Sequence, residues 1–227
     1  MTLLDGLNYF KQYSDSDWKF TLKVESSANE VLKLISLYGN QPNASALAAA
    51  QLLLIDIEKW KAMCLEDRIG NAEQNSQRDV WNAFRDALIA SNDLDAILSI
   101  MRLKGFGSSR DEESGQRRAK VATAALRFLK PEEWGVVDWR TIAMLRFLRK
   151  AKWNVDQALM LAKKEKAADL RSLFSIVNEE AACEVNREYR AKRAAEPFSR
   201  TVDVEMAIFG LSVMAWPFPR SSVAPKP

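Results

Sequence analysis

The chain has 227 residues, 48% of them apolar, which is ample material for the core of one large or two small domains. It contains no histidine, which excludes Ser-His-Asp and Cys-His catalysis, histidine-ligated zinc and any histidine general base. The net charge is only +3, but residues 100–153 carry 13 basic and 6 acidic side chains (+7), against −5 for residues 1–99 and +1 for residues 154–227. This basic middle suits either a phosphate-binding surface or the solvated face of a helix.

The two cysteines, Cys64 and Cys183, are too few for a four-thiolate zinc or iron–sulfur site, and we expect both to be reduced, buried thiols. No stretch approaches the ~20 consecutive apolar residues that a membrane span needs, and the first residues lack the features of a signal peptide. The sequence therefore predicts a cytoplasmic protein with no membrane partner.

Helical periodicity runs through the chain without the alternation typical of β-strands, so the predicted fold class is all-α. The predicted helices cover residues 2–12, 28–38, 44–66, 77–90, 93–103, 116–130, 139–150, 155–165, 168–195 and 202–214. Three side chains are helix-start signals, namely Asn43, Ser76 and Asn154. The proline-rich end, residues 217–227, is predicted to be a flexible tail.

A polar turn at residues 38–42 precedes helix 44–66, which is apolar on nearly all sides at first and is predicted to be central and buried. Two side chains of this turn, Asn40 and Gln41, either reach a ligand or simply belong to an ordinary turn.

Helix 93–103 runs into Leu-Lys-Gly-Phe-Gly at residues 103–107. Gly105 and Gly107 let the chain turn sharply and direct N–H groups outward, which suits a phosphate, although a glycine past a helix end is commonly only a C-cap. The next predicted helix places three cations on one face, Arg117, Lys120 and Arg127.

Two valines then lead inward to Asp138, which directly precedes helix 139–150. Asp138 either caps this helix, which would stabilise it by roughly 0.5–2 kcal/mol, or presents a carboxylate to a ligand.

These residues resemble the helix-hairpin-helix DNA glycosylase superfamily, of the endonuclease III and 8-oxoguanine glycosylase type. That family has a Leu-x-Gly-x-Gly hairpin, a lysine at the start of the following helix in its bifunctional members, and Val-Asp at the start of a further helix. The corresponding segments here are Leu103-Lys104-Gly105-Phe106-Gly107, Lys120-Val121-Ala122 and Val137-Asp138. Residues 204–209 are also similar to the closing helix of 8-oxoguanine glycosylase-like proteins. The likeness is specific over about 40 residues, and it departs from the family where residues 108–119 separate the hairpin from Lys120.

The resemblance implies two helical lobes, residues 28–137 and residues 1–27 with 138–216, and duplex DNA in the cleft between them. Asp138 would be catalytic, and Lys120 would be either a nucleophile that also nicks abasic strands or a phosphate contact. The expected DNA-backbone contacts are Gly105, Phe106, Gly107, Arg117, Arg118, Arg127 and Arg140. The expected base pocket comprises Trp139, Phe209, Asn40 and Gln41, with core packing as the alternative role of the two aromatic residues.

We expect no iron–sulfur cluster and no cofactor apart from a monovalent cation at the hairpin. The sequence thus predicts a monomeric DNA glycosylase that acts on double-stranded DNA. Its substrate is either an oxidised base such as 8-oxoguanine or a bulky hydroxymethylated or glucosylated cytosine of phage DNA, which would make it an antiviral defence enzyme. The alternatives are a DNA-binding protein without catalysis and a helical scaffold with no nucleic-acid role.

Overall fold

The computed structural model describes residues 1–13, 15–62, 70–107 and 119–218, and over these residues the chain is helical. The helices are α1 (Leu3–Tyr13), α2 (Asp15–Tyr38), α3 (Ala44–Lys61), a short 3-10 helix η2 (Ala72–Gln74), α4 (Gln77–Ile89), α5 (Asp93–Met101), α6 (Lys120–Leu129), α7 (Trp139–Lys150), α8 (Val155–Ala162), α9 (Ala167–Leu173), α10 (Glu179–Ala195) and α11 (Thr201–Ala215). The predicted all-α class is therefore confirmed for the described part of the chain.

Helix α2 is longer than predicted, because it begins at Asp15 and not at residue 28. Its first half buries a narrow stripe that includes Thr21 and Val24. The threonine is tied into the core by a hydrogen bond of 2.9 Å from the indole N–H of Trp60 to its hydroxyl oxygen. Because the buried stripe is narrow and includes a threonine, residues 15–27 show little of the apolar periodicity from which a helix is predicted.

The helix predicted at residues 168–195 is two helices, α9 and α10. Helix α10 begins after Asn178, whose side chain accepts a hydrogen bond from the N–H of Ala181 at 2.9 Å and so acts as its N-cap. The remaining predicted helices are found with ends that differ by a few residues, and α7 has the predicted bounds.

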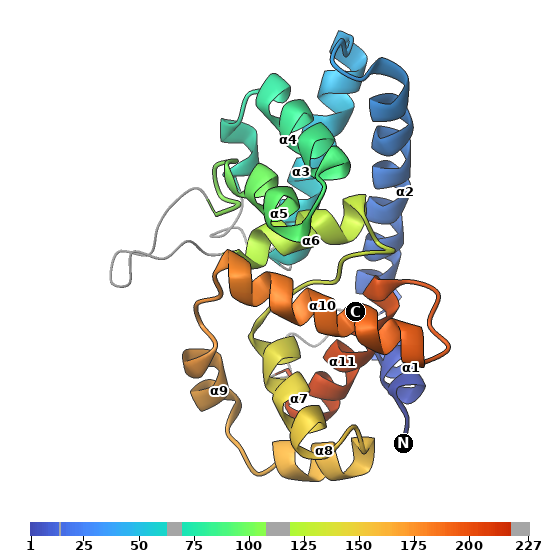
Figure 1. The fold of residues 1–227 in the computed structure, drawn as a ribbon, viewed down its shortest axis with the longest axis vertical. Helices are drawn as coiled ribbons and strands as arrows, with labels where there is room; N and C mark the ends of the chain where they lie inside the picture. The colour runs from blue at the N-terminus through green and yellow to red at the C-terminus, as the bar shows by residue number, and fades with distance from the viewer. Residues whose placement is uncertain (14, 63–69, 108–118, 219–227) are drawn as a thin grey trace, which may run out of the picture.

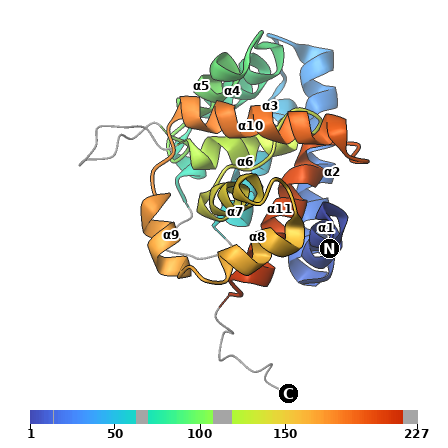
Figure 2. The same cartoon turned by 60° about the horizontal axis from the view of Figure 1, so that its bottom comes forward.

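The helices form two groups along the length of the molecule (Figure 1). Helices α3 to α6 lie at one end, and α1, α7, α8, α9 and α11 lie at the other. Helix α2 runs along the side of the first group towards α1, and α10 crosses between the groups (Figures 1 and 2). The buried apolar side chains form one cluster that continues through both groups.

Helix α1 packs against α11, the last helix of the described part of the chain. Their backbones approach closely at two glycines, since a Cβ added to Gly210 would lie 2.0 Å from the carbonyl oxygen of Gly6. The ring of Phe209 meets Phe10 edge to face nearby, at a centroid distance of 5.7 Å. Among the described residues, no helix combines the length and apolar character that a membrane crossing requires.

Candidate functional site

The glycine hairpin at residues 103–107 is held by the polar segment that follows α3. The side-chain oxygen of Asn75 accepts from the N–H of Lys104 at 2.7 Å, and its amide donates to the carbonyl of Lys104 at 3.1 Å. Gly105 and Gly107 have φ values of 84° and 116°. A Cβ on Gly105 would lie 2.4 Å from the Cβ of Asn71, so glycine is required there both for its conformation and for this close approach.

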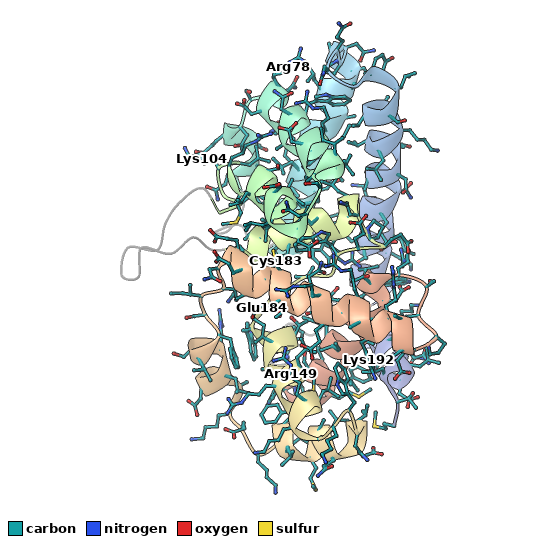
Figure 3. The ribbon with its side chains drawn as sticks, in the orientation of Figure 1. Arg78, Lys104, Arg149, Cys183, Glu184 and Lys192 are labelled. Atoms are coloured by element: carbon teal, nitrogen blue, oxygen red, sulfur yellow. The ribbon has the colours of Figure 1, made fainter. Side chains whose placement is uncertain are left out.

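The hairpin offers fewer N–H groups to a phosphate than its glycines suggest. Asn75 accepts the N–H of Lys104, and the carbonyl of Leu103 accepts the N–H of Phe106 at 3.0 Å. Phe106 is buried as a whole, so neither its side chain nor its backbone reaches the surface. The N–H groups of Gly105 and Gly107 have no hydrogen-bond partner among the described residues. Gly107 is buried, however, and only Gly105 is partly exposed, next in the chain to the exposed side chain of Lys104 (Figure 3).

The last turn of α3 anchors the segment that supports the hairpin. The buried carboxylate of Glu58 accepts hydrogen bonds from three consecutive N–H groups, those of Gly70 at 2.8 Å, Asn71 at 3.0 Å and Ala72 at 3.2 Å. A carboxylate with this many donors is a firm anchor, because charge-assisted hydrogen bonds are stronger than neutral ones. The position of the hairpin is therefore fixed from α3.

Asp138 is the N-cap of α7. Its Oδ1 accepts from the N–H groups of Arg140 at 2.9 Å and Thr141 at 3.1 Å, and its own N–H donates to the hydroxyl of Thr141 at 3.1 Å, which completes a capping box. The residue before Asp138 is held as well, because the N–H of Val137 donates to the hydroxyl of Thr123 on α6 at 3.0 Å. The capping role is thus confirmed, and it uses only one of the two carboxylate oxygens.

The other oxygen of Asp138 faces an amine from α3. The Nζ of Lys61 lies 3.5 Å from Oδ2 of Asp138, and the two side chains are 19% and 18% exposed. Both side chains are therefore mostly, but not fully, shielded from solvent. Lys61 lies one helical turn from Glu58, so the same turn of α3 holds both the hairpin support and the acid.

Lys120 lies at the start of α6, as predicted, but its amine is directed to the end of α9. It donates to the carbonyl oxygens of Phe174, at 2.6 Å, and Ser175. The amine that the structure places against Asp138 is therefore that of Lys61.

Comparisons of the chain with protein-family models, curated proteins and solved structures find no match.

Two predicted DNA-backbone contacts are wrong, because their side chains are inside the protein. Arg127 is 1% exposed, and its guanidinium lies 5.0 Å above the ring of Trp60 and 4.5 Å above that of Phe128. Arg140 is 6% exposed and donates to the carbonyl of Trp216 at 2.8 Å. Neither guanidinium can lie against a phosphate in this arrangement. Arg117 and Arg118 lie outside the described residues.

Two members of the predicted base pocket are far from Asp138. Asn40 and Gln41 lie in the turn before α3, whereas Lys61 is at the opposite end of that helix, which at 1.5 Å per residue is roughly 25 Å away. The side-chain oxygen of Asn40 accepts from the guanidinium of Arg85. The prediction that these two residues line a pocket beside the acid is therefore wrong.

The two aromatic candidates are packed against other rings. Trp139 lies next to Asp138 in the chain, and its ring is 6.2 Å from that of Trp216. Phe209 contacts Phe10 and lies 6.4 Å from Phe218. Both remain partly exposed, so the base-stacking role predicted for them is untested.

A buried network of charges lies behind the site. The guanidinium of Arg127 is 3.5 Å from Oε1 of Glu25 and 3.6 Å from Oε2 of Glu205. Arg200 continues it, with ion pairs to Glu25 at 3.5 Å and Asp203 at 2.9 Å. The N–H of Val136, two residues before Asp138, is hydrogen-bonded to Glu205. Burial raises the pKa of Glu205 to about 7, and the negative charge of Asp138 adds to this rise while Arg127 opposes it.

The proton on Glu205 gives a testable dependence of stability on pH. Its folded-state pKa is raised from 4.5 to about 7, so the stability that this protonation contributes is fully present below pH 4.5 and is lost as the pH rises through 7. The loss amounts to about 3 kcal/mol. The Glu205→Gln variant has no such proton, so its stability relative to the natural protein should rise across this pH range in urea unfolding. Equal differences at pH 5 and pH 8 would contradict the buried carboxyl, and Glu30→Gln, at an exposed site of α2, is the control.

Sequence reasoning missed Lys61, Glu58 and Glu205. Lys61 gave no local signal, because its partner lies 77 residues further along the chain. The partners of Glu58 lie 12 to 14 residues away, in a loop that no helical pattern relates to it. Glu205 did give one, since it is an acid in a helix whose neighbours, Val204 and Met206, are apolar, and an ionisable group in apolar surroundings is a candidate for a perturbed pKa.

Cys183 is buried on α10, as predicted, and Cys64 lies outside the described residues (Figure 3). Burial raises the pKa of the Cys183 thiol to about 11, so it is no thiolate nucleophile at neutral pH. It borders a cavity of about 740 Å³ in which Asp93 is paired with Arg190. Among the described residues, no group of three or more potential metal ligands is placed to hold an ion.

Proposed function

We propose that the protein is a DNA glycosylase that flips a damaged or modified base out of duplex DNA and breaks its bond to C1′ of the sugar. The observation that carries the proposal is that one turn of α3 contacts both the support of the glycine hairpin and the carboxylate of Asp138. Glu58 fixes the segment that supports the glycine hairpin, and Lys61 lies against the free oxygen of Asp138. A backbone grip and a carboxylate positioned by the same helix are what base excision requires.

The hairpin is suited to a phosphate of the DNA backbone. The partly exposed Gly105 has an N–H group without a partner among the described residues, and the exposed Lys104 adds a positive charge next to it in the chain. Contacts of this kind fix the register of a protein on a duplex without reading its sequence. In the proposed arrangement the DNA lies between the two groups of helices, with the hairpin on one side and α7 on the other.

Asp138 is suited to the chemical step. Departure of a base leaves positive charge on the sugar, which a carboxylate stabilises electrostatically or relieves by activating a water molecule. Oδ1 is held by two N–H groups at the start of α7, so Oδ2 has a fixed direction. Lys61 forms an ion pair with this oxygen at 3.5 Å and so helps to hold it in place.

The test is mass spectrometry of the bases released from duplex DNAs. We expect release of a single modified base from one of three substrates: oxidised DNA, phage DNA with hydroxymethylated cytosine, or phage DNA with glucosylated cytosine. The abasic product is detected by alkaline cleavage. Release of 8-oxoguanine favours repair, and release of a modified cytosine favours defence against phage. Salt-dependent duplex binding without any release would instead favour a non-catalytic DNA-binding protein.

A further inference from the structure

The turn between α8 and α9 and the helix that follows it carry a strip of exposed cations. The strip consists of Lys163, Lys164, Lys166 and Arg171. None of these four side chains forms an ion pair with a described residue. Two exposed acids, Glu165 and Asp169, are interspersed with them, so the segment has a net charge of +2.

The near end of the strip is attached to the residues beside Asp138. The indole N–H of Trp216 donates to the carbonyl oxygens of Ala162 at 3.1 Å and Glu165 at 3.2 Å, which bracket the first lysines. The same indole packs against Trp139, the neighbour of Asp138. A hydrogen bond of 2.8 Å from Arg140 to the carbonyl of Trp216 locks this stack to the first turn of α7.

The far end of the strip is attached to the start of α6. Lys120 binds the carbonyls of Phe174 and Ser175, and the N–H of Ala119 donates to the carbonyl of Val177 at 2.8 Å. The strip therefore leads from the surroundings of Asp138 to the chain that enters α6. Helix α9 lies on the same side of the molecule as α5, whose end leads into the hairpin (Figures 1 and 2).

We propose that this basic strip binds the phosphate backbone of duplex DNA next to the nucleotide at Asp138, as a second grip in addition to the hairpin. The inference rests on the proposed function. With phosphate contacts at the hairpin alone, the duplex could rotate about that point. Phosphate contacts on both sides of Asp138 would fix the orientation of the DNA strand. Unpaired, exposed lysines are suited to this role, because they release the counterions of the phosphates without first breaking a protein ion pair.

The proposal is tested by fluorescence anisotropy with a 20-base-pair duplex of arbitrary sequence, measured at several salt concentrations. The variant Lys163→Gln/Lys164→Gln/Lys166→Gln should weaken binding about tenfold or more at low salt. The slope of log K against log salt should fall by two to three units, since each phosphate contact contributes about 0.9. The variant Glu165→Gln/Asp169→Asn should bind more tightly than the natural protein.

A matched control removes three exposed cations elsewhere, in Lys11→Gln/Lys33→Gln/Arg187→Gln on α1, α2 and α10. If it weakens binding as much as the strip variant, the effect is one of net charge and the strip is not a site. If the natural protein binds but the strip variant has an unchanged slope, the second grip is wrong while the glycosylase proposal stands. No binding by the natural protein at any salt would overturn both.

Discussion

Replacing Asp138 by asparagine is expected to lower the rate of base release by about 10²–10⁴, the range that a positioned acid–base group contributes. The fold should survive, because asparagine is as good an N-cap as aspartate and its side-chain oxygen can keep the hydrogen bonds from Arg140 and Thr141. The change removes the negative charge that faces Lys61 and leaves the shape almost unaltered. Single-turnover base release and thermal unfolding, measured on the same preparation, separate catalysis from stability.

Two further variants complete this experiment. Asp138→Ala removes the cap as well, so it should lose about 1 kcal/mol of stability in addition to activity. Asp156→Asn changes an exposed aspartate on α8 and should alter neither property appreciably. Full activity of Asp138→Asn would show that the residue is only a helix cap and would remove the chemical step from the proposed function.

The sequence was a good guide where a local pattern determines the structure. The start of α7 is one case, since an aspartate followed by a threonine three residues later makes its own capping box. The hairpin is another, because Gly105 and Gly107 adopt the positive φ angles that their type favours. Both features depend on residues close together in the chain, and both are found where they were predicted.

The prediction for Arg127 was wrong because a helix in the centre of the fold has no solvated face at that point. Residues 122–129 of α6 are all buried, so the side of the helix that looks polar in the sequence packs against α2 and α11. Burying a charged arginine there destabilises the fold unless carboxylates pair with its guanidinium. Those acids, Glu25 and Glu205, lie about 100 and 80 residues away in sequence, and no local pattern relates them to it.

The resemblance placed Lys120 and Asp138 in one site, but a position in the sequence does not fix where a flexible lysine points. The carbonyls at the end of α9 hold the amine of Lys120, and α3 supplies the amine that faces the acid. Helix α3 meets Asp138 only because the whole fold brings it there, so Lys61 could not be identified before the structure.

The substitution of Lys61 decides whether the site can also nick DNA. A neutral amine that attacks C1′ of an abasic sugar forms a Schiff base with loss of water, and elimination then breaks the C3′–O bond of the strand. Asp138 lies where it can accept the proton that the amine must lose, with Oδ2 at 3.5 Å from Nζ. We expect borohydride to trap the natural protein on DNA with an abasic site, and Lys61→Ala to abolish the crosslink.

Two lysine variants make this result specific. Lys59→Ala changes a neighbour on α3 and should crosslink normally. Lys120→Ala should lose about 1 kcal/mol of stability, because it removes the donor from a partly buried carbonyl and an exposed one at the end of α9, but it should still crosslink. Loss of trapping in Lys120→Ala alone would restore that residue as the nucleophile. Base release without any trapping would mean that water is the attacking group, and Lys61 would then serve only to hold the carboxylate of Asp138 in place.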